Sequence, residues 1–177
     1  MNKIILLLFS VLCLMGRAQG NSEWKMCVVS DVHLMAPELL KSDGKAFQDY
    51  LSSDRKLLGE SVEIMDSITN RLLAEHPKVL LVTGDLTKDG ENVSHQYLVD
   101  HFLSKLRRSG VRVFVVPGNH DVNNPHAVVF DGDKTRRTTT VSPSEFASVY
   151  ADYGYRQALA RDAASLSYVA QLASGLR

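Results

Sequence analysis

The stretch VRVFVVPGNHDV, residues 111–122, joins a run of apolar residues to a polar turn. The run from Val111 to Val116 is typical of a buried strand, because strands covered on both faces are continuously apolar. Gly118 allows the chain to turn sharply after the run. Three polar residues follow this glycine: Asn119, His120 and Asp121. The stretch therefore predicts a strand that carries polar side chains at its carboxyl end.

Two earlier stretches repeat this pattern of a buried strand followed by polar residues. Residues 25–30 (KMCVVS) lead directly to Asp31 and His33, and residues 78–83 (KVLLVT) lead to a Gly-Asp pair that ends at Asp85. The three strands are far apart in the sequence. If they lie in one parallel sheet, their carboxyl ends share one edge, which is where open α/β sheets bind ligands.

Helical periodicity separates these strands. Apolar residues recur at helical spacing from Asp54 to Glu75 and again from Val93 to Leu106. Pro77 ends the first helix near His76, and Gly110 ends the second. The order β-α-β-α-β predicts an α/β fold with a largely parallel sheet that is covered on its faces.

The rest of the chain gives weaker signals. Residues 122–142 are polar and predict a loop. Ser142 and Glu145 form a capping box with Pro at the first helical position, which predicts that a helix begins there. The expected elements are helices near 143–150 and 155–162 and a strand over 165–170.

The composition is that of one globular domain. The chain has 177 residues, of which 45% are apolar and 23% charged, so disorder, collagen and coiled coil are poor interpretations. The formal net charge is zero. Nucleic acid is therefore not an expected partner, because such proteins carry a basic surface.

Residues 1–20 are typical of a secretory signal peptide. Lys3 gives a positive start, the run from Ile4 to Met15 is apolar except for Ser10, and the small residues Ala18 and Gly20 fit cleavage after Gly20. The run is shorter than the roughly 20 residues that span a bilayer. We expect an exported protein, periplasmic or secreted, with residues 21–177 as its domain and no transmembrane segment in the mature chain. An uncleaved anchor is the alternative.

The polar residues at the strand ends suit a metal site. Asp31 and His33 are two apart, so an extended backbone would point both the same way. Asp85 has two oxygens that can bridge two cations, and Asn119 offers a neutral oxygen. Mixed nitrogen and oxygen ligands suit Zn, Mn or Fe, and the lack of thiolates argues against a structural zinc site.

Three motifs resemble those of the calcineurin-like metallophosphoesterase family: Asp31-x-His33, Gly84-Asp85-x4-Gly90, and Gly118-Asn119-His120-Asp121. The resemblance extends from about residue 25 to the C-terminus. It implies a four-layer α/β/β/α sandwich, of which this chain holds the first half, and two divalent metal ions. One ion would be bound by Asp31 and His33 and the other by Asn119, with Asp85 bridging them.

The resemblance also implies hydrolysis of phosphate esters. Two cations roughly 3.5–4 Å apart share a water, lower its pKa and clamp the phosphate oxygens during in-line attack. His120 would face the phosphoryl group, as general acid to the leaving oxygen or as transition-state stabiliser. Many family members orient this histidine with an Asp three residues after the bridging one, where this chain has Lys88. Either Asp89 or Asp121 takes that role.

Part of the family pattern is missing. Members carry a later Gly-His and a Gly-His-x-His that complete both metal shells, whereas only His126 follows Asp121 here. We therefore expect a domain that is incomplete at its C-terminus, as a fragment or a genuine truncation. Metal affinity would be low, one sheet face would be exposed, and residues 21–177 alone would show little or no activity. The DNA downstream of the Arg177 codon would decide this.

Three further questions stay open. The expected substrate is a phosphorylated small molecule or lipid, and the alternative function is that of a non-catalytic secreted binding protein that retains the phosphoesterase fold. A basic cluster of Lys134, Arg136 and Arg137 either contacts a substrate phosphate or is simply solvated. His126 either joins the metal shell or lies in a loop near the entrance to the site.

Overall fold

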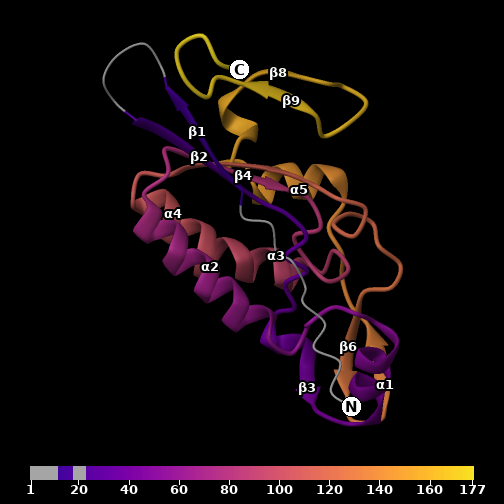
Figure 1. The fold of residues 1–177 in the computed structure, drawn as a ribbon. Coiled ribbons are helices and arrows are strands. Elements are labelled where there is room, and N and C mark those ends of the chain that lie inside the picture. Colours follow the sequence, from indigo (N-terminus) through magenta and orange to yellow (C-terminus); the bar gives the residue numbers. More distant parts are fainter. Residues whose placement is uncertain (1–11, 18–22) are drawn as a thin grey trace.

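A four-stranded sheet lies at the centre of the computed structural model, which describes residues 12–17 and 23–177 (Figure 1). The strand order is β1-β2-β4-β5. The last three strands are parallel, as predicted, and β1 is an antiparallel edge strand. The bounds are Leu12–Arg17 for β1, Glu23–Val29 for β2, Val79–Thr83 for β4 and Arg112–Val116 for β5.

The register of the sheet places the ends of the parallel strands side by side. Val29 of β2 pairs with Val82 of β4, and Val82 pairs with Val115 of β5. Each strand therefore leaves the sheet at nearly the same level. The three loops that carry the predicted site residues start from this common edge.

Strand β1 falls within residues 1–20, for which we predict a signal peptide. Residues 1–11 and 18–22 lie outside the described residues. Cleavage after Gly20 would remove β1 and leave β2 as the edge of the sheet.

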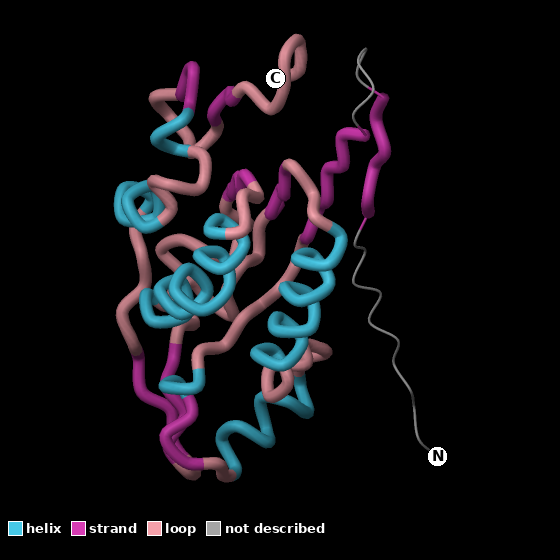
Figure 2. Tube along the Cα trace, turned by 90° about the vertical axis from the view of Figure 1, so that its left-hand side faces the viewer, coloured by secondary structure: helices cyan, strands magenta, loops and turns pink. Residues whose placement is uncertain are grey.

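Helices cover one face of the sheet (Figures 1 and 2). They are α2 (Ser61–Glu75), α5 (Pro143–Val149) and a continuous helical segment made of α3 (Asn92–Leu98), the π-helical η2 (Val99–Leu103) and α4 (Ser104–Arg108). The covered face carries alternate residues of each strand, which is the pattern of a strand with one face in a core. These residues are Cys27, Val29, Leu80, Val82, Val113 and Val115.

The prediction that a helix spans 54–75 was wrong at its start. Helix α2 begins at Ser61, and a separate helix α1 spans Lys45–Ser53. The side chain of Asp54 accepts a hydrogen bond from the Lys56 amide at 3.1 Å, and such a local bond competes with helix formation. Leu58 is buried in a second apolar cluster away from the sheet. The predicted end was correct, since α2 stops at Glu75 and His76 adopts a left-handed conformation.

The prediction that residues 122–142 form a loop was also wrong. This segment contains the hairpin of β6 (Val128–Asp131) and β7 (Lys134–Arg137), which pairs with β3 (Leu40–Ser42). Phe130 is fully buried against the rings of Phe47 and Tyr50 of α1, with centroids 5.0 and 5.4 Å away. This lobe, which also includes η1 (Pro37–Leu39), extends from the carboxyl edge of the main sheet (Figure 2).

The C-terminal segment was predicted correctly only in part. The capping box of Ser142 and Glu145 is present at the start of α5. The helix expected over 155–162 is instead the short η3 (Tyr155–Gln157) followed by β8 (Ala158–Arg161). Strand β8 pairs with β9 (Tyr168–Ala170), a contact between segments that helical periodicity does not reveal.

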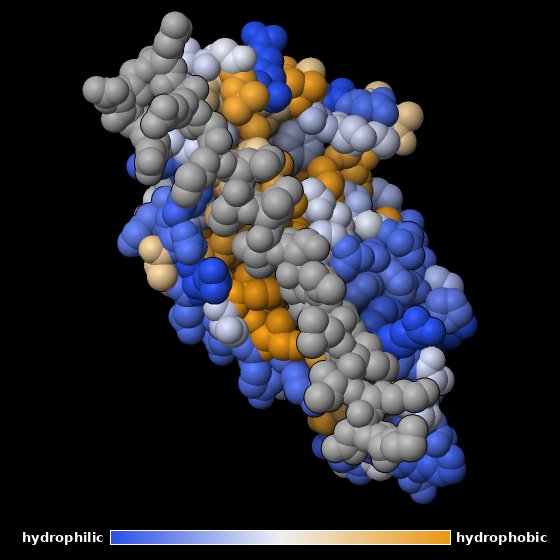
Figure 3. Space-filling view, in the orientation of Figure 1, coloured by the Kyte–Doolittle hydropathy of each residue, from blue (hydrophilic) through white to orange (hydrophobic). Residues whose placement is uncertain are grey.

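The face of the sheet opposite the helices is covered in part. Among the described residues, the C-terminal segment packs there, with Ala170 against Val79 and Phe114. A groove of about 410 Å³ remains beside it, and Leu81, Thr83 and Val116 line its floor. Figure 3 shows apolar surface in a band along the middle of the molecule, with hydrophilic surface on both sides.

None of the helices in the described part of the chain combines the length and the apolar character needed to cross a bilayer.

Candidate metal centre and catalytic residues

Backbone hydrogen bonds hold the loops after β2 and β4 together. The Asp31 amide donates to the Gly84 carbonyl at 3.2 Å, and the His33 amide donates to the Asp85 carbonyl at 2.9 Å. The third loop joins them because the His120 amide donates to Oδ1 of Asp85 at 3.1 Å. Asp85 therefore lies where the three loops meet.

Three side chains form a compact group of potential metal ligands. The ligand atoms of His33, Asp85 and His120 all lie within 4.8 Å of one another. Nε2 of His33 is 3.8 Å from Oδ2 of Asp85, and the two imidazole rings are perpendicular with centroids 4.9 Å apart. Residues that are 87 positions apart in the sequence thus meet at the carboxyl edge of the sheet, as the strand pattern predicts.

Two glycines allow this close approach. A β-carbon on Gly118 would overlap the backbone nitrogen and carboxylate of Asp85. Gly84 has a φ of 91°, and a β-carbon there would lie 2.8 Å from the Gly118 nitrogen. Side chains at these positions would push the loops apart, which explains why both motifs contain glycine.

The backbone at the site is strained. Asp31, His33 and Asp85 have φ values of 57°, 44° and 49°. These are three of the five non-glycine residues with positive φ in the described ranges 12–17 and 23–177. Such conformations cost of order 1–3 kcal/mol each and gather at functional sites, where the surrounding structure enforces them.

This backbone corrects one premise of the sequence analysis. Asp31 and His33 are not in extended backbone, so their spacing alone does not point them the same way. His33 is half-buried, whereas Asp31 is exposed and its carboxylate accepts a hydrogen bond from the Ser30 hydroxyl. Asp31 lies on the rim of the site. Asn119, at the tip of the third loop, is also exposed.

The chemistry of His33 fits a metal ligand. Among the described residues, its Nδ1 is one of few buried side-chain polar atoms without a hydrogen-bond partner. Burial lowers the pKa of His33, and the positive charge of Lys56 lowers it further. The imidazole is therefore held neutral, which is the form that binds a metal. The group as a whole offers the nitrogen and oxygen atoms that Zn, Mn and Fe accept.

Asp89 contacts the ring of His120. Nδ1 of His120 is 3.0 Å from Oδ1 of Asp89 and 2.8 Å from the Lys88 carbonyl. Both partners accept hydrogen bonds, so Nδ1 carries the proton and Nε2 is left to face the site. Burial raises the pKa of Asp89, but the hydrogen bond and charge of Lys88, together with the hydrogen bond to His120, hold the pKa below the usual value. Of the two aspartates left open by the sequence, Asp89 has the geometry to orient the ring.

The Asp121 carboxylate accepts hydrogen bonds from two loops of the site. Asp121 is fully buried, and its carboxylate accepts hydrogen bonds from the Leu86 amide at 3.1 Å and the Gly118 amide at 2.8 Å. The amide and hydroxyl of Thr87 also donate to it, both at 3.0 Å. Asp121 thereby ties the loop after β4 to the loop after β5, which sets the distance between Asp85 and His120.

A buried histidine supports the same turn. Nε2 of His95 donates to the Asp121 carbonyl at 2.9 Å, and Nδ1 lies 2.7 Å from the Tyr150 hydroxyl. Both side chains are fully buried. Burial lowers the pKa of His95, so the ring is neutral. The sequence carries no signal for this contact, because it joins α3 to the end of α5.

Lys56 is a residue of the site that sequence analysis missed, because the periodicity placed it inside a helix. It lines a small pocket together with Asp31 and His33, and its side chain is 18% exposed. Its ammonium lies 3.4 Å from Oδ2 of Asp54. The segment before α2 therefore supplies a positive charge beside the predicted metal ligands.

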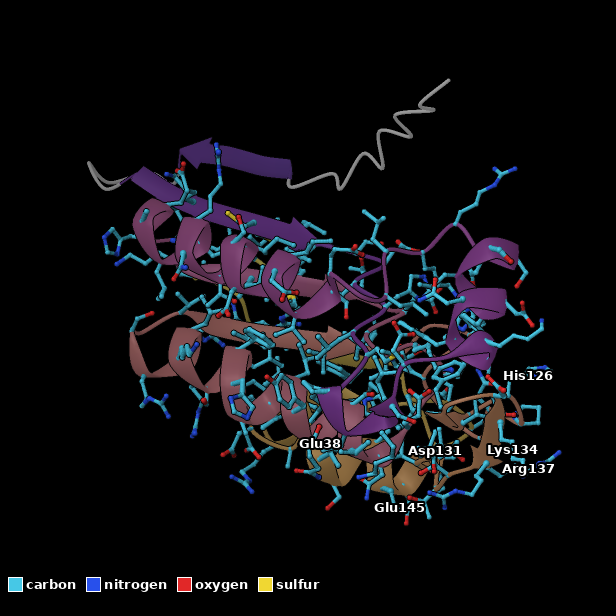
Figure 4. All side chains as sticks on the ribbon, turned by 90° about the horizontal axis from the view of Figure 1, so that it is seen from below. Glu38, His126, Asp131, Lys134, Arg137 and Glu145 are labelled. Carbon is cyan, nitrogen blue, oxygen red and sulfur yellow. The ribbon has the colours of Figure 1, made fainter. Side chains whose placement is uncertain are left out.

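The polar residues beyond the site are solvated. His126 is exposed, and its amide donates to Oδ1 of Asn124 at 2.9 Å. All four residues of β7 are exposed, including the basic cluster. Figure 4 shows the side chains of His126, Lys134 and Arg137 along one margin of the molecule.

The geometry agrees with one comparison with known proteins. The profile of a family described as calcineurin-like phosphoesterase matches residues 25–165, which contain all three loops of the site. No curated protein matches the chain closely enough to count as a relative. Because the family profile covers most of its length, the chain belongs to the calcineurin-like phosphoesterase family.

Proposed function

We propose that this protein hydrolyses phosphate esters, phosphodiesters or phosphomonoesters, with a dinuclear centre of divalent metal ions. Membership of the family implies a hydrolase that acts on phosphorylated substrates. The observation that carries the proposal for this chain is the convergence of two proposed ligands, His33 and Asp85, with His120, the proposed acid: one nitrogen or oxygen atom of each lies within 4.8 Å of the others. We propose Mn, Fe or Zn as the metal and phosphorylated small molecules or lipids as substrates.

Four residues are proposed to hold the metal ions: Asp31, His33, Asp85 and Asn119. The close approach of Asp85 to the other two loops supports this set. So do the neutral imidazole of His33 and its Nδ1 atom, which has no hydrogen-bond partner. When bound, the cations would polarise the phosphoryl oxygens and lower the pKa of a water molecule.

His120 is proposed to act on the leaving group. Its ring is held through Nδ1 by Asp89 and by the Lys88 carbonyl, which leaves Nε2 as the atom that can exchange a proton. A proton delivered from Nε2 to the departing oxygen would prevent the release of a free alkoxide. Asp89 supports this step because a carboxylate beside Nδ1 stabilises the ring while it carries two protons.

The four proposed ligands are few for two cations, since catalytic metals are commonly held by about three protein ligands each. We therefore propose that the 177-residue chain binds metal weakly and turns over slowly. Bis-p-nitrophenyl phosphate and p-nitrophenyl phosphate, with Mn²⁺ or Zn²⁺ varied from micromolar to millimolar, test this. We expect slow release of p-nitrophenolate that saturates only at millimolar metal and stops with a chelator.

Two outcomes would contradict this proposal. Saturation at micromolar metal would show that the ligand set is stronger than proposed. Binding of inorganic phosphate without turnover at any metal concentration would favour the second candidate, a secreted binding protein that keeps the fold. Export remains a proposal from residues 1–20, and N-terminal sequencing of the mature protein tests it.

Replacement of His120 by Ala is expected to lower kcat by roughly 10²–10⁴-fold, the usual contribution of a positioned acid or base. Metal affinity, measured by isothermal titration calorimetry, should stay unchanged because His120 is proposed to face the phosphoryl group. His101→Ala is the matched control, since His101 is exposed on η2 and stacks on Tyr97. Loss of metal binding in His120→Ala would instead identify His120 as a ligand.

Replacement of Lys56 by Ala is expected to raise KM for a phosphomonoester by about tenfold, because a hydrogen bond to a charged group contributes about 1.5–3 kcal/mol. The reason is its position in the pocket beside Asp31 and His33. Steady-state kinetics measure the change, with Lys105→Ala as a control at an exposed lysine of α4. An unchanged KM together with a lower unfolding temperature would mean that Lys56 only supports the loop through Asp54.

A further inference from the structure

We infer that Lys88 is a positioning residue for His120, because it holds the Asp89 carboxylate in the one orientation that presents Oδ1 to the histidine ring. The inference rests on the proposed function of His120. Lys88 occupies the position at which the resemblance leads us to expect an aspartate. The side chain at that position therefore has the opposite charge to the expected one.

Lys88 is a fully buried lysine with two acidic partners. Its side chain has no exposed surface, and its Nζ lies 2.5 Å from Oδ2 of Asp89 and 3.1 Å from Oε1 of Glu91. The rings of Tyr50 and Phe130 lie 5.0 and 5.6 Å from the ammonium. Lysines are almost never fully buried unless paired, so this charge is held in place by its partners.

The two oxygens of Asp89 have different partners. Oδ2 contacts Lys88, while Oδ1 contacts Nδ1 of His120 at 3.0 Å and accepts a hydrogen bond from the side-chain amide of Asn124 at 3.3 Å. The backbone of Asp89 is also held, because its amide donates to Oε2 of Glu91 at 3.1 Å. A carboxylate tethered in this way cannot rotate about its Cβ–Cγ bond without losing the contact to the ammonium. The chain of contacts from Glu91 through Lys88 and Asp89 thus ends on the ring of His120.

A purely structural role is the competing explanation. Glu91 is also fully buried, and Lys88 could simply neutralise it and fill space beneath Tyr50 and Phe130. The two explanations differ in what happens when both charges are removed together. Removal of Lys88 and Glu91 as a pair relieves the structural problem, but it leaves Oδ2 of Asp89 without its partner.

The experiment compares Lys88→Met with Lys88→Met/Glu91→Gln and uses Lys105→Met as the control at an exposed lysine. The first readout is the ¹H chemical shift of the Nδ1 proton of His120 in the metal-free chain, which reports its hydrogen bond to Asp89. We expect a downfield, slowly exchanging proton in the wild type and in Lys105→Met. In both Lys88 variants the backbone carbonyl of residue 88 still accepts from Nδ1, so we expect the Nδ1–H form to remain but its proton to shift upfield and to exchange faster. In the double variant, urea unfolding should show partial recovery of stability.

The second readout is the dependence of kcat on the leaving group, measured with p-nitrophenyl phosphate and phenyl phosphate. A misplaced acid matters more when the leaving group is poor. The Lys88 variants should therefore lose roughly tenfold more rate with phenyl phosphate than with the p-nitrophenyl ester, with little change in KM. A general loss of folding would reduce both rates by the same factor.

A wild-type Nδ1 proton shift in the double variant, or equal losses on the two esters, would overturn the inference and leave Lys88 as a structural ion-pair partner. If the wild-type chain hydrolyses neither ester, the proposed function fails instead. The Nδ1 proton shift of His120 then still decides whether Lys88 positions the ring.

Discussion

Asp85→Asn is expected to lower kcat/KM for phosphate esters by roughly 10³-fold, because metal ions contribute several kcal/mol to transition-state stabilisation and each 1.36 kcal/mol is a factor of ten. Asp85 has the most central position of the proposed ligands. Its carboxylate lies 3.8 Å from His33 and accepts the amide hydrogen of His120 at 3.1 Å. The amide of Asn keeps the shape and one acceptor oxygen but loses the negative charge.

Two measurements distinguish the loss of a metal ligand in Asp85→Asn from a loss of stability. Isothermal titration with Mn²⁺ should show weaker binding, whereas the urea unfolding midpoint should change little, because Asn can still accept from the His120 amide. Asp66→Asn is the control, since Asp66 is an exposed carboxylate on α2. Hydrolysis at the wild-type rate by Asp85→Asn would refute the bridging role.

Asp121→Ala is expected to destabilise the fold by about 4 kcal/mol, a large part of the roughly 5–15 kcal/mol that stabilises a domain. The Asp121 carboxylate is fully buried and accepts four hydrogen bonds, three of them from backbone amides. Alanine would leave these amides buried without a partner, at a cost of about 1–3 kcal/mol for each. Urea unfolding followed by circular dichroism measures the loss.

The same variant separates the two aspartates that the sequence left open. Asp121→Ala should lower stability, and its remaining activity should follow the folded fraction. Asp100→Ala is the control at an exposed carboxylate of η2. Wild-type stability together with a large loss of kcat would mean that Asp121, rather than Asp89, acts on His120.

The central strands were predictable because their signal is local. Each is a run of five or more mostly apolar residues bounded by turn residues, and the observed strands start or end within two residues of the predicted bounds. The lobe was not predictable in this way. The residues of β7 are all exposed and polar, so only their pairing with β6 and the burial of Phe130 against α1 define a sheet there.

The residues of the candidate site were likewise predictable only in part. The motifs predicted which residues lie at the carboxyl edge, because strand order and polar strand ends depend on residue type and spacing. No sequence pattern identified Lys56 as a residue of the site, since its position beside His33 depends on a helix that begins at Ser61 and not at Asp54. Lys88 stood out only as a departure from a motif. Its burial between Asp89 and Glu91 was not visible in the chain.

The sequence by itself determined the parallel order of the strands and the identity of the residues at their ends, because hydrophobic pattern and turn chemistry act between near neighbours. Only the tertiary structure shows that Asp89 contacts the ring of His120, while Asp121 binds backbone amides. Both lie within the motifs, but hydrogen bonds between loops more than thirty residues apart direct Asp121 to backbone amides and Asp89 to the ring of His120. Such long-range contacts depend on how the loops pack, which no local pattern records.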